Sequence, residues 1–141
     1  MAFGDEQKVV REVLASWADT VVDWSDFNAG RFEPPAPDPA AGEQASWIRP
    51  AVRVGDARRA ELGPVAIRRT TGVVIVQVFV PIGAGDAIAA SLAASVAAVF
   101  RDLEQDGMQF LEPQPRPVGP EPDGAWYQVN VEIPFRRDER I

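Results

Sequence analysis

The feature that most constrains this chain is one apolar stretch in its middle, residues 68–100, which combines a strand pattern, a turn and a helix pattern. Between residues 73 and 80 the side chains on both alternating faces are mostly β-branched or aromatic. Strands covered on both faces have this composition, so we expect a central strand here. Pro81 and the glycines of residues 83–85 end it. From Asp86, a typical capping residue, apolar residues recur at helical spacing to about Gly107, which predicts a helix lying on the sheet.

The composition excludes most familiar catalytic chemistry. The chain contains no histidine and no cysteine, and Lys8 is the single lysine among its 141 residues. Disulfides, zinc sites built from Cys and His, and Ser–His or Cys–His nucleophile pairs are therefore impossible. We predict that the protein is not an enzyme and uses neither a cofactor nor a metal.

Length and charge fit a single domain over residues 1–141. A chain of this size with 46% hydrophobic residues can bury one sizeable core. The net charge of −7 has the wrong sign for wrapping around nucleic acid. The first ten residues lack the basic and apolar parts of a secretion signal, and no run matches a membrane span. We therefore expect assembly in the cytosol and no membrane partner.

Further periodic segments predict the rest of the secondary structure. Apolar residues at helical spacing predict a first helix over residues 5–18, and residues 21–24 can form a short strand. Residues 47–54 alternate and are expected to form an antiparallel hairpin with a strand that begins near Val65, with a loop from Gly55 between them. Residues 126–135 alternate between apolar and polar side chains, which predicts a half-buried strand with one wet face. Residues 136–141 are expected to be a charged tail.

Prolines mark two long loops. Four prolines lie within residues 34–39 and five within residues 112–123. Proline lacks the N–H that a ladder or helix needs, so we expect no regular structure in either segment. The predicted fold class is α+β, a mixed, mainly antiparallel sheet of about four strands with two helices packed on it and long proline-rich loops.

Two patterns suggest a bound ligand, and each has a simpler explanation. Residues 83–86 lie between a strand and a helix, where glycine-rich turns bind dinucleotide phosphates. Asp86 would place a carboxylate beside such a phosphate, so a tight turn explains the glycines better. Asp19, Asp23 and Asp26 could hold a hard cation, but their spacing matches no calcium loop. A solvated helix end is the favoured explanation for these three carboxylates.

Protein contacts are the more promising use of the surface. Three arginine pairs bracket predicted strands, and arginine suits bidentate pairing with carboxylates across an interface. Solvation of strand ends is the alternative, and both remain open. The wet face of the last strand favours contacts at Trp126, whereas Trp24 is expected to cap the core. The candidate interface residues are Arg58, Arg59, Arg68, Arg69, Trp126, Gln128, Arg136 and Arg137.

Several different segments follow one another in a characteristic order along the chain. A first helix is followed by Val22-Asp23-Trp24-Ser25-Asp26-Phe27 and a proline-rich loop, then by the strand of residues 47–54. Residues 68–81, two glycines, an alanine-rich helix and the closing residues 124–135 complete the series. In this order the chain resembles the tail-terminator (minor tail protein) family of long-tailed bacteriophages and related phage-derived particles. The resemblance spans most of the 141 residues and makes them a single tail-terminator-like domain.

The resemblance implies a non-enzymatic ring subunit, typically in six copies, that caps the head-proximal end of the tail tube and ends its polymerisation. The implied partners are other copies of the chain, the tail tube protein and the head connector protein, with DNA only passing through the ring. Assembly in the bacterial cytoplasm and a final place in the tail of a virion or phage-like particle are implied as well. Net negative charge would keep a ring lumen from adhering to DNA.

Two other functions stay open beside the terminator. One is a head–tail joining (connector or stopper) protein of the same particles, which would bind the connector without ending tube growth. The other is a small α+β module that binds a ligand near residues 83–86, where the predicted helix leaves the sheet.

Overall fold

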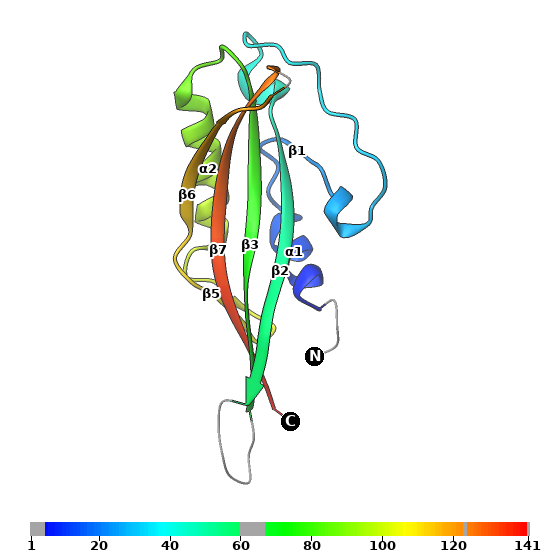
Figure 1. Cartoon of the computed structure of the whole chain (residues 1–141), viewed down its shortest axis with the longest axis vertical. Helices are drawn as coiled ribbons and strands as arrows, with labels where there is room; N and C mark the ends of the chain where they lie inside the picture. The colour runs from blue at the N-terminus through cyan, green and yellow to red at the C-terminus, as the bar shows by residue number, and fades with distance from the viewer. Residues whose placement is uncertain (1–4, 60–66, 123, 141) are drawn as a thin grey trace.

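The computed structural model describes residues 5–59, 67–122 and 124–140, which form a curled sheet with its helices on one side (Figure 1). Seven strands are present in these residues, in the order β1-β2-β3-β7-β5-β4, and β6 pairs separately with β7. All neighbours are antiparallel except β1 and β2, which run parallel. The strands are β1 (Val21–Val22), β2 (Trp47–Arg59), β3 (Ile67–Pro81), β4 (Glu104–Gln105), β5 (Met108–Phe110), β6 (Gln114–Pro120) and β7 (Trp126–Arg140).

The predicted fold class is wrong. The structure is mostly β, a curled, mixed, half-barrel sheet of seven strands, where about four strands carrying two helices were expected. The additional strands β4 and β5 occupy residues at the predicted end of the second helix and just after it, and β6 lies in the second predicted loop. Strand β6 was missed because its prolines predicted a loop. Strands β4 and β5 were missed because the helical pattern was extended beyond the true end of the second helix.

Strand β6 forms in spite of its prolines because it lies at an edge. Pro115 and Pro117 stand opposite Val131 and Val129 of β7. The two prolines are two residues apart on one strand, so the backbone nitrogens that lack a hydrogen both point to the same side of β6. Strand β7 is the only strand paired with β6 in the described part of the chain, so this side can face away from the ladder. Proline therefore excludes a central strand here but not an edge strand.

Strands β2, β3 and β7 form the long centre of the sheet. The predicted β2–β3 hairpin is confirmed, and β3 pairs with both β2 and β7, as expected for a central strand. Two boundaries were wrong, because β2 continues past Gly55 to Arg59 and β7 continues through the predicted tail to Arg140. The predicted start of the second strand near Val65 lies outside the described residues.

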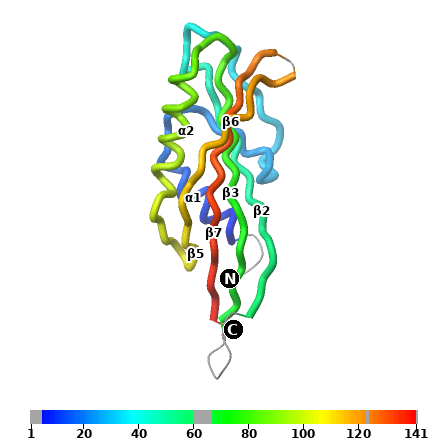
Figure 2. Tube along the Cα trace, turned by 60° about the vertical axis from the view of Figure 1, so that its left-hand side comes forward, coloured from blue at the N-terminus to red at the C-terminus, as the bar shows by residue number. Residues whose placement is uncertain are grey.

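One face of the sheet, which we call the covered face, packs against both helices (Figure 2). On β3 this face carries Val74, Val76 and Val78, each 0% exposed. Ile75 and Gln77, which alternate with them, point to the opposite side and are half-buried. The prediction that β3 is covered on both faces is therefore wrong for the middle of the strand.

Helix α1 (Asp5–Leu14) and helix α2 (Asp86–Phe100) supply the other half of this core. Both helices end earlier than predicted, and the N-cap of α2 is Gly85 rather than Asp86. The buried side of α2 alternates larger residues with alanines, which allow close approach to β3 and β7; it consists of Ala89, Leu92, Ala93, Val96, Ala97 and Phe100. No helix within the described residues has the length and apolar character to cross a bilayer.

The first proline-rich loop contains no helix or strand between residues 28 and 41, as predicted, and aromatic side chains anchor it. Trp24 precedes the short 3-10 helix Ser25–Phe27, and its ring packs edge-to-face on that of Phe27 with the centroids 5.0 Å apart. Both rings pack against the main core. Phe32 lies 5.2 Å from Trp47. The prediction that Trp24 caps the core is confirmed. A second 3-10 helix, Gly42–Ala45, leads into β2.

Candidate functional site

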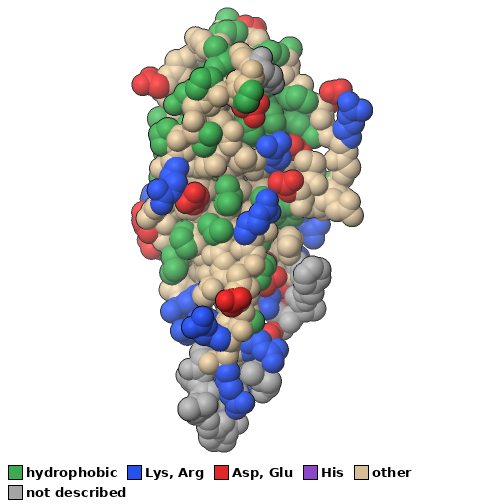
Figure 3. All heavy atoms as spheres, viewed as in Figure 1, with side chains coloured by type: hydrophobic (Ala, Val, Ile, Leu, Met, Phe, Trp, Pro, Cys, Tyr) green, Lys and Arg blue, Asp and Glu red, His purple; other side chains and the backbone are tan. Residues whose placement is uncertain are grey.

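The face of the sheet opposite the helices, which we call the open face, is the broadest candidate surface. Strand alternation places polar and charged side chains along it, among them Arg49 of β2, Gln77 of β3, and Asn130 and Glu132 of β7. Figure 3 shows basic and acidic side chains beside one another across the middle of the molecule. The wet face predicted for the last strand is thus part of a polar layer that several strands share.

Side chains on the open face pair with one another, both between neighbouring strands and along β7. Nε of Arg49 donates to Oε1 of Gln77 at 2.7 Å, and Nε of Arg116 donates to Oε2 of Glu132 at 2.7 Å. Nε2 of Gln128 donates to Oδ1 of Asn130 at 2.7 Å. These bonds satisfy charges and amides on a half-exposed surface, so the face is ordered without being covered.

The strongest pair on this face joins β3 to the end of β7. Nε and Nη2 of Arg69 donate to Oδ1 and Oδ2 of Asp138 at 2.8 and 2.9 Å, a bidentate arrangement. The hydrogen bond from Arg69 lowers the pKa of Asp138 below its usual value of 3.8. Beside it, Nε of Arg136 donates to Oε1 of Gln109 at 2.8 Å.

The three arginine pairs predicted from the sequence do not act as pairs. Consecutive residues of a strand point to opposite faces, so one member of each pair lies on the open face and the other on the covered side. The open-face members are Arg58, Arg69 and Arg136, and the covered-side members are Arg59, Arg68 and Arg137. Arg68 lies 3.8 Å from Glu139, which is a loose ion pair.

Arg137 has a structural position under helix α1. Its Nη1 lies 2.6 Å from Oε1 of Glu6, and the two side chains are only 7% and 5% exposed. The contact is an ion pair whose geometry does not meet the angles of a hydrogen bond, and Nε of Arg137 has no hydrogen-bond partner within the described part of the chain. An arginine in this place is not available to a partner protein in the monomer.

Trp126 faces the open side as the alternation predicted, but it is not an exposed anchor. Its ring meets Trp47 edge-to-face at 5.8 Å, and Trp47 stacks on Phe79 at 4.1 Å. With Phe32 packed on them, these rings form a small second core, and Trp126 is 5% exposed. The guanidinium of Arg49 lies over Phe79 at 5.1 Å and closes one side of the cluster.

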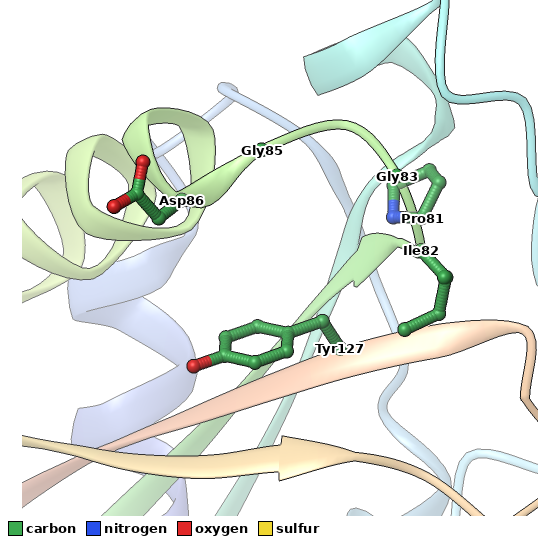
Figure 4. Close-up of a pocket in the computed structure, with 6 residues that line it drawn as sticks. All are labelled: Pro81, Ile82, Gly83, Gly85, Asp86 and Tyr127. Atoms are coloured by element: carbon green, nitrogen blue, oxygen red, sulfur yellow. The ribbon is translucent and has the colours of Figure 1, made fainter.

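The turn between β3 and α2 contains a hollow of about 340 Å³, at the place where the ligand-binding alternative was expected (Figure 4). Its lining residues are Pro81, Ile82, Gly83, Gly85, Asp86 and Tyr127. Gly83 and Gly85 have φ of 89° and 93°, a conformation that favours glycine whether or not a ligand is present. The lining contains the carboxylate of Asp86 and no basic side chain, which disfavours a phosphate. The predicted tight turn is confirmed.

A second hollow of about 390 Å³ continues from the first, between α2 and β6. Ala90 and Ala94 of the helix face Pro115 and Pro117 of the strand across it. After Asp86 the exposed side of α2 carries only alanine and serine, without a charge. Sequence reasoning missed this groove because it depends on β6 being a strand.

Two of the three carboxylates considered for a cation, Asp19 and Asp23, have other partners. Asp23 is 4% exposed, accepts a hydrogen bond from the backbone N of Ser25 at 2.8 Å and lies 3.9 Å from Arg49. Asp19 accepts a hydrogen bond from the hydroxyl of Ser95. Among the described residues, no three metal-ligating side chains gather at one place.

Comparison with known proteins finds a matching family and a solved structure of the same fold. The family model described as phage tail terminator protein matches residues 13–135. One solved structure superposes with a TM-score of 0.57 at 22% sequence identity, covering 95% of this chain and 90% of that chain, which shows a shared fold. No curated protein matches the chain.

Proposed function

Because the chain belongs to the phage tail terminator protein family, we propose that it forms a ring, of six copies, that caps the head-proximal end of a phage tail tube and ends its polymerisation. A structural part in a phage tail follows from the family itself. What we propose beyond this is that the chain forms a ring, that the ring has six copies, and that it contacts the tail tube and the head connector.

The observation that carries the proposal is the extent of the family match. Residues 13–135 run from the end of α1 to the middle of β7 and include the complete β2–β3 hairpin, α2 and β6. The match therefore covers both faces of the sheet and its edges, rather than one shared motif. The family supports a non-enzymatic function.

The surface of the subunit is compatible with a closed ring. A ring of identical subunits needs two different complementary patches on each copy, and the sheet offers distinct surfaces on its open face and at its edges. The net charge of −7 disfavours adhesion to DNA that passes through such a ring. This sign supports passage of DNA rather than its retention.

Electron microscopy of the purified protein with tail tube subunits tests the proposal. We expect tubes that carry a ring at one end and stop growing when the protein is added. Tubes of unlimited length with the protein unbound would contradict it. Protein that binds the head connector while tube growth continues would identify a head–tail joining protein instead.

A further inference from the structure

We propose that neighbouring copies in the ring meet edge to edge, with the outer edge of β2 on one copy seated against the β4 corner of the next. The basic edge is defined as residues 53–59 of β2, and the acidic corner as residues 101–106, which include β4. This inference rests on the proposed ring and identifies the two patches that a ring requires.

The basic edge pairs with β3 on one side, and its outer side has no partner strand among the described residues. Strand β1 pairs with β2 only at Trp47 and Ile48, and no other described strand lies on that side. Residues 53–59 are all exposed. An edge of this length presents unpaired N–H and C=O groups, which native proteins usually cover or block. The β6 edge carries prolines that block it, whereas residues 53–59 contain none.

Charge distinguishes the two edges. On the basic edge, Arg53 bonds only to the carbonyl of Val52 at 3.4 Å, and Arg58 has no partner among the described residues. Asp56 is the one acid of residues 53–59. Even with Arg59 left out of the count, Arg53 and Arg58 against one aspartate leave the basic edge positive in a chain that is negative overall.

The acidic corner has the opposite sign. Asp102, Glu104 and Asp106 are exposed and form no ion pair with other described residues. Arg101 is the one basic residue of this segment and is already paired, with its Nε 3.4 Å from Oε1 of Glu112. Unpaired acids therefore stand on the edge of the sheet opposite Arg53 and Arg58, which gives a head-to-tail contact its charge complementarity.

The two edges lie at the same level of the sheet. Glu104 stands opposite Gln109, Gln109 opposite Arg136, and Arg136 opposite Thr71 of β3. Thr71 lies opposite the bulge between Val54 and Ala57 of β2. A line across the strands from the acidic corner thus reaches the middle of the basic edge. A rotation about an axis parallel to the strands joins the edges without translation, as a closed ring requires.

Strand direction and apolar contact agree with this arrangement. The antiparallel steps from β2 through β3, β7 and β5 leave β4 running in the same direction as β2. In a rotated neighbour β4 would therefore lie parallel to β2. Val54 is 47% exposed and Leu111, close to the acidic corner, is 42% exposed, so each edge offers one apolar side chain near the same level.

Charge exchange between the two edges tests the inference on the full chain. One variant combines Arg53→Glu with Arg58→Glu, and a second combines Glu104→Arg with Asp106→Arg. Self-association is measured by sedimentation velocity, with the protein alone and with tail tube subunits. Each variant is expected to associate roughly tenfold more weakly than wild type, because like charges would meet at every contact. A 1:1 mixture of the two variants, and a chain that carries all four changes, are expected to recover the rings.

The control for the first variant is Arg11→Glu with Arg31→Glu, which makes the same change in net charge at exposed residues outside both edges. It is expected to assemble like wild type. Thermal unfolding checks that each variant is folded, and Arg53→Gln with Arg58→Gln replaces the first variant if that chain unfolds. Assembly of either reversed variant at wild-type strength, or a mixture that stays dissociated, overturns the edge contact. The proposed function fails separately, if wild-type protein neither forms rings nor caps tubes.

Discussion

The two faces of the sheet use the same strands for different purposes. On the covered face Val74, Val76 and Val78 are fully buried beneath the helices, while on the open face Arg49 and Gln77 are held by hydrogen bonds between side chains. Apolar burial supplies most of the free energy of folding, and polar pairs at a half-exposed surface add little to it. The comparison indicates that the covered face holds the fold together and leaves the open face and the edges free for contacts.

The largest expected difference between the faces comes from an aspartate at adjacent positions of β3. Val76→Asp places an unpaired charge in the fully buried core, and we expect a loss of about 4 kcal/mol or more, enough to prevent folding. Ile75→Asp, one residue away on the open face, is expected to remain folded. Circular dichroism melting of both variants measures this. A folded Val76→Asp protein would show that the covered face is assigned wrongly.

Two ion pairs sharpen the comparison. Removing the charge of Glu6 leaves Arg137 buried without a counterion, and Glu6→Gln is expected to cost about 3 kcal/mol. Asp138→Asn breaks the pair with Arg69, whose side chains are 37% and 35% exposed, and is expected to cost only about 0.5 kcal/mol. Urea unfolding gives both free energies. Equal losses would mean that solvent reaches both pairs alike.

Gly72 tests how tightly the long strands approach. A Cβ at this residue would lie 2.5 Å from the carbonyl oxygen of Arg53 and 2.6 Å from the ring of Phe135 on the covered face. Gly72→Ala is therefore expected to destabilise the protein by about 2 kcal/mol. Gly55→Ala, where the nearest atom is 3.0 Å away, is the milder control. The free energies of unfolding of the two variants should differ in that order, and a neutral Gly72→Ala would contradict the packing.

The smallest effect is a pH dependence on the open face. The hydrogen bond from Arg69 lowers the pKa of Asp138 in the folded chain, so the unfolded chain takes up a proton first as the pH falls. The stabilisation is present above the usual pKa of 3.8 and disappears as the pH drops through the lower folded value. The difference in unfolding free energy between wild type and Asp138→Asn should shrink from about 0.5 kcal/mol at neutral pH toward zero in acid. A constant difference would rule out this pair as its source.

Much of the fold could be predicted where a local pattern has one physical meaning. The valine-rich strand β3, the glycine turn after it and the helix from Asp86 follow from side-chain period and from φ values that favour glycine. The prediction of secondary structure failed where the effect of a residue depends on which strands lie beside it. Pro115 and Pro117 exclude a strand in the middle of a sheet but not at its edge, and only the pairing with β7 decides which applies.

The candidate surface was predicted less well for the same reason. Alternation placed Gln128 and Trp126 correctly on the open face, but it could not show that Trp47 and Phe32 cover Trp126. Nor could it separate Arg137, buried against Glu6, from Arg136 on the open face. Burial of a side chain depends on segments that are distant in sequence, and a local pattern contains no information about them.

By itself the sequence determined which side-chain types the chain can use, since it contains neither histidine nor cysteine. It also determined the order of the segments, which resembles that of a phage tail terminator, and the family match agrees. Only the tertiary structure decided which residues lie at an open edge and which acids stand opposite which arginines. Side-chain period depends on the backbone of one segment alone, whereas exposure, edge position and charge complementarity are set by which strands pair.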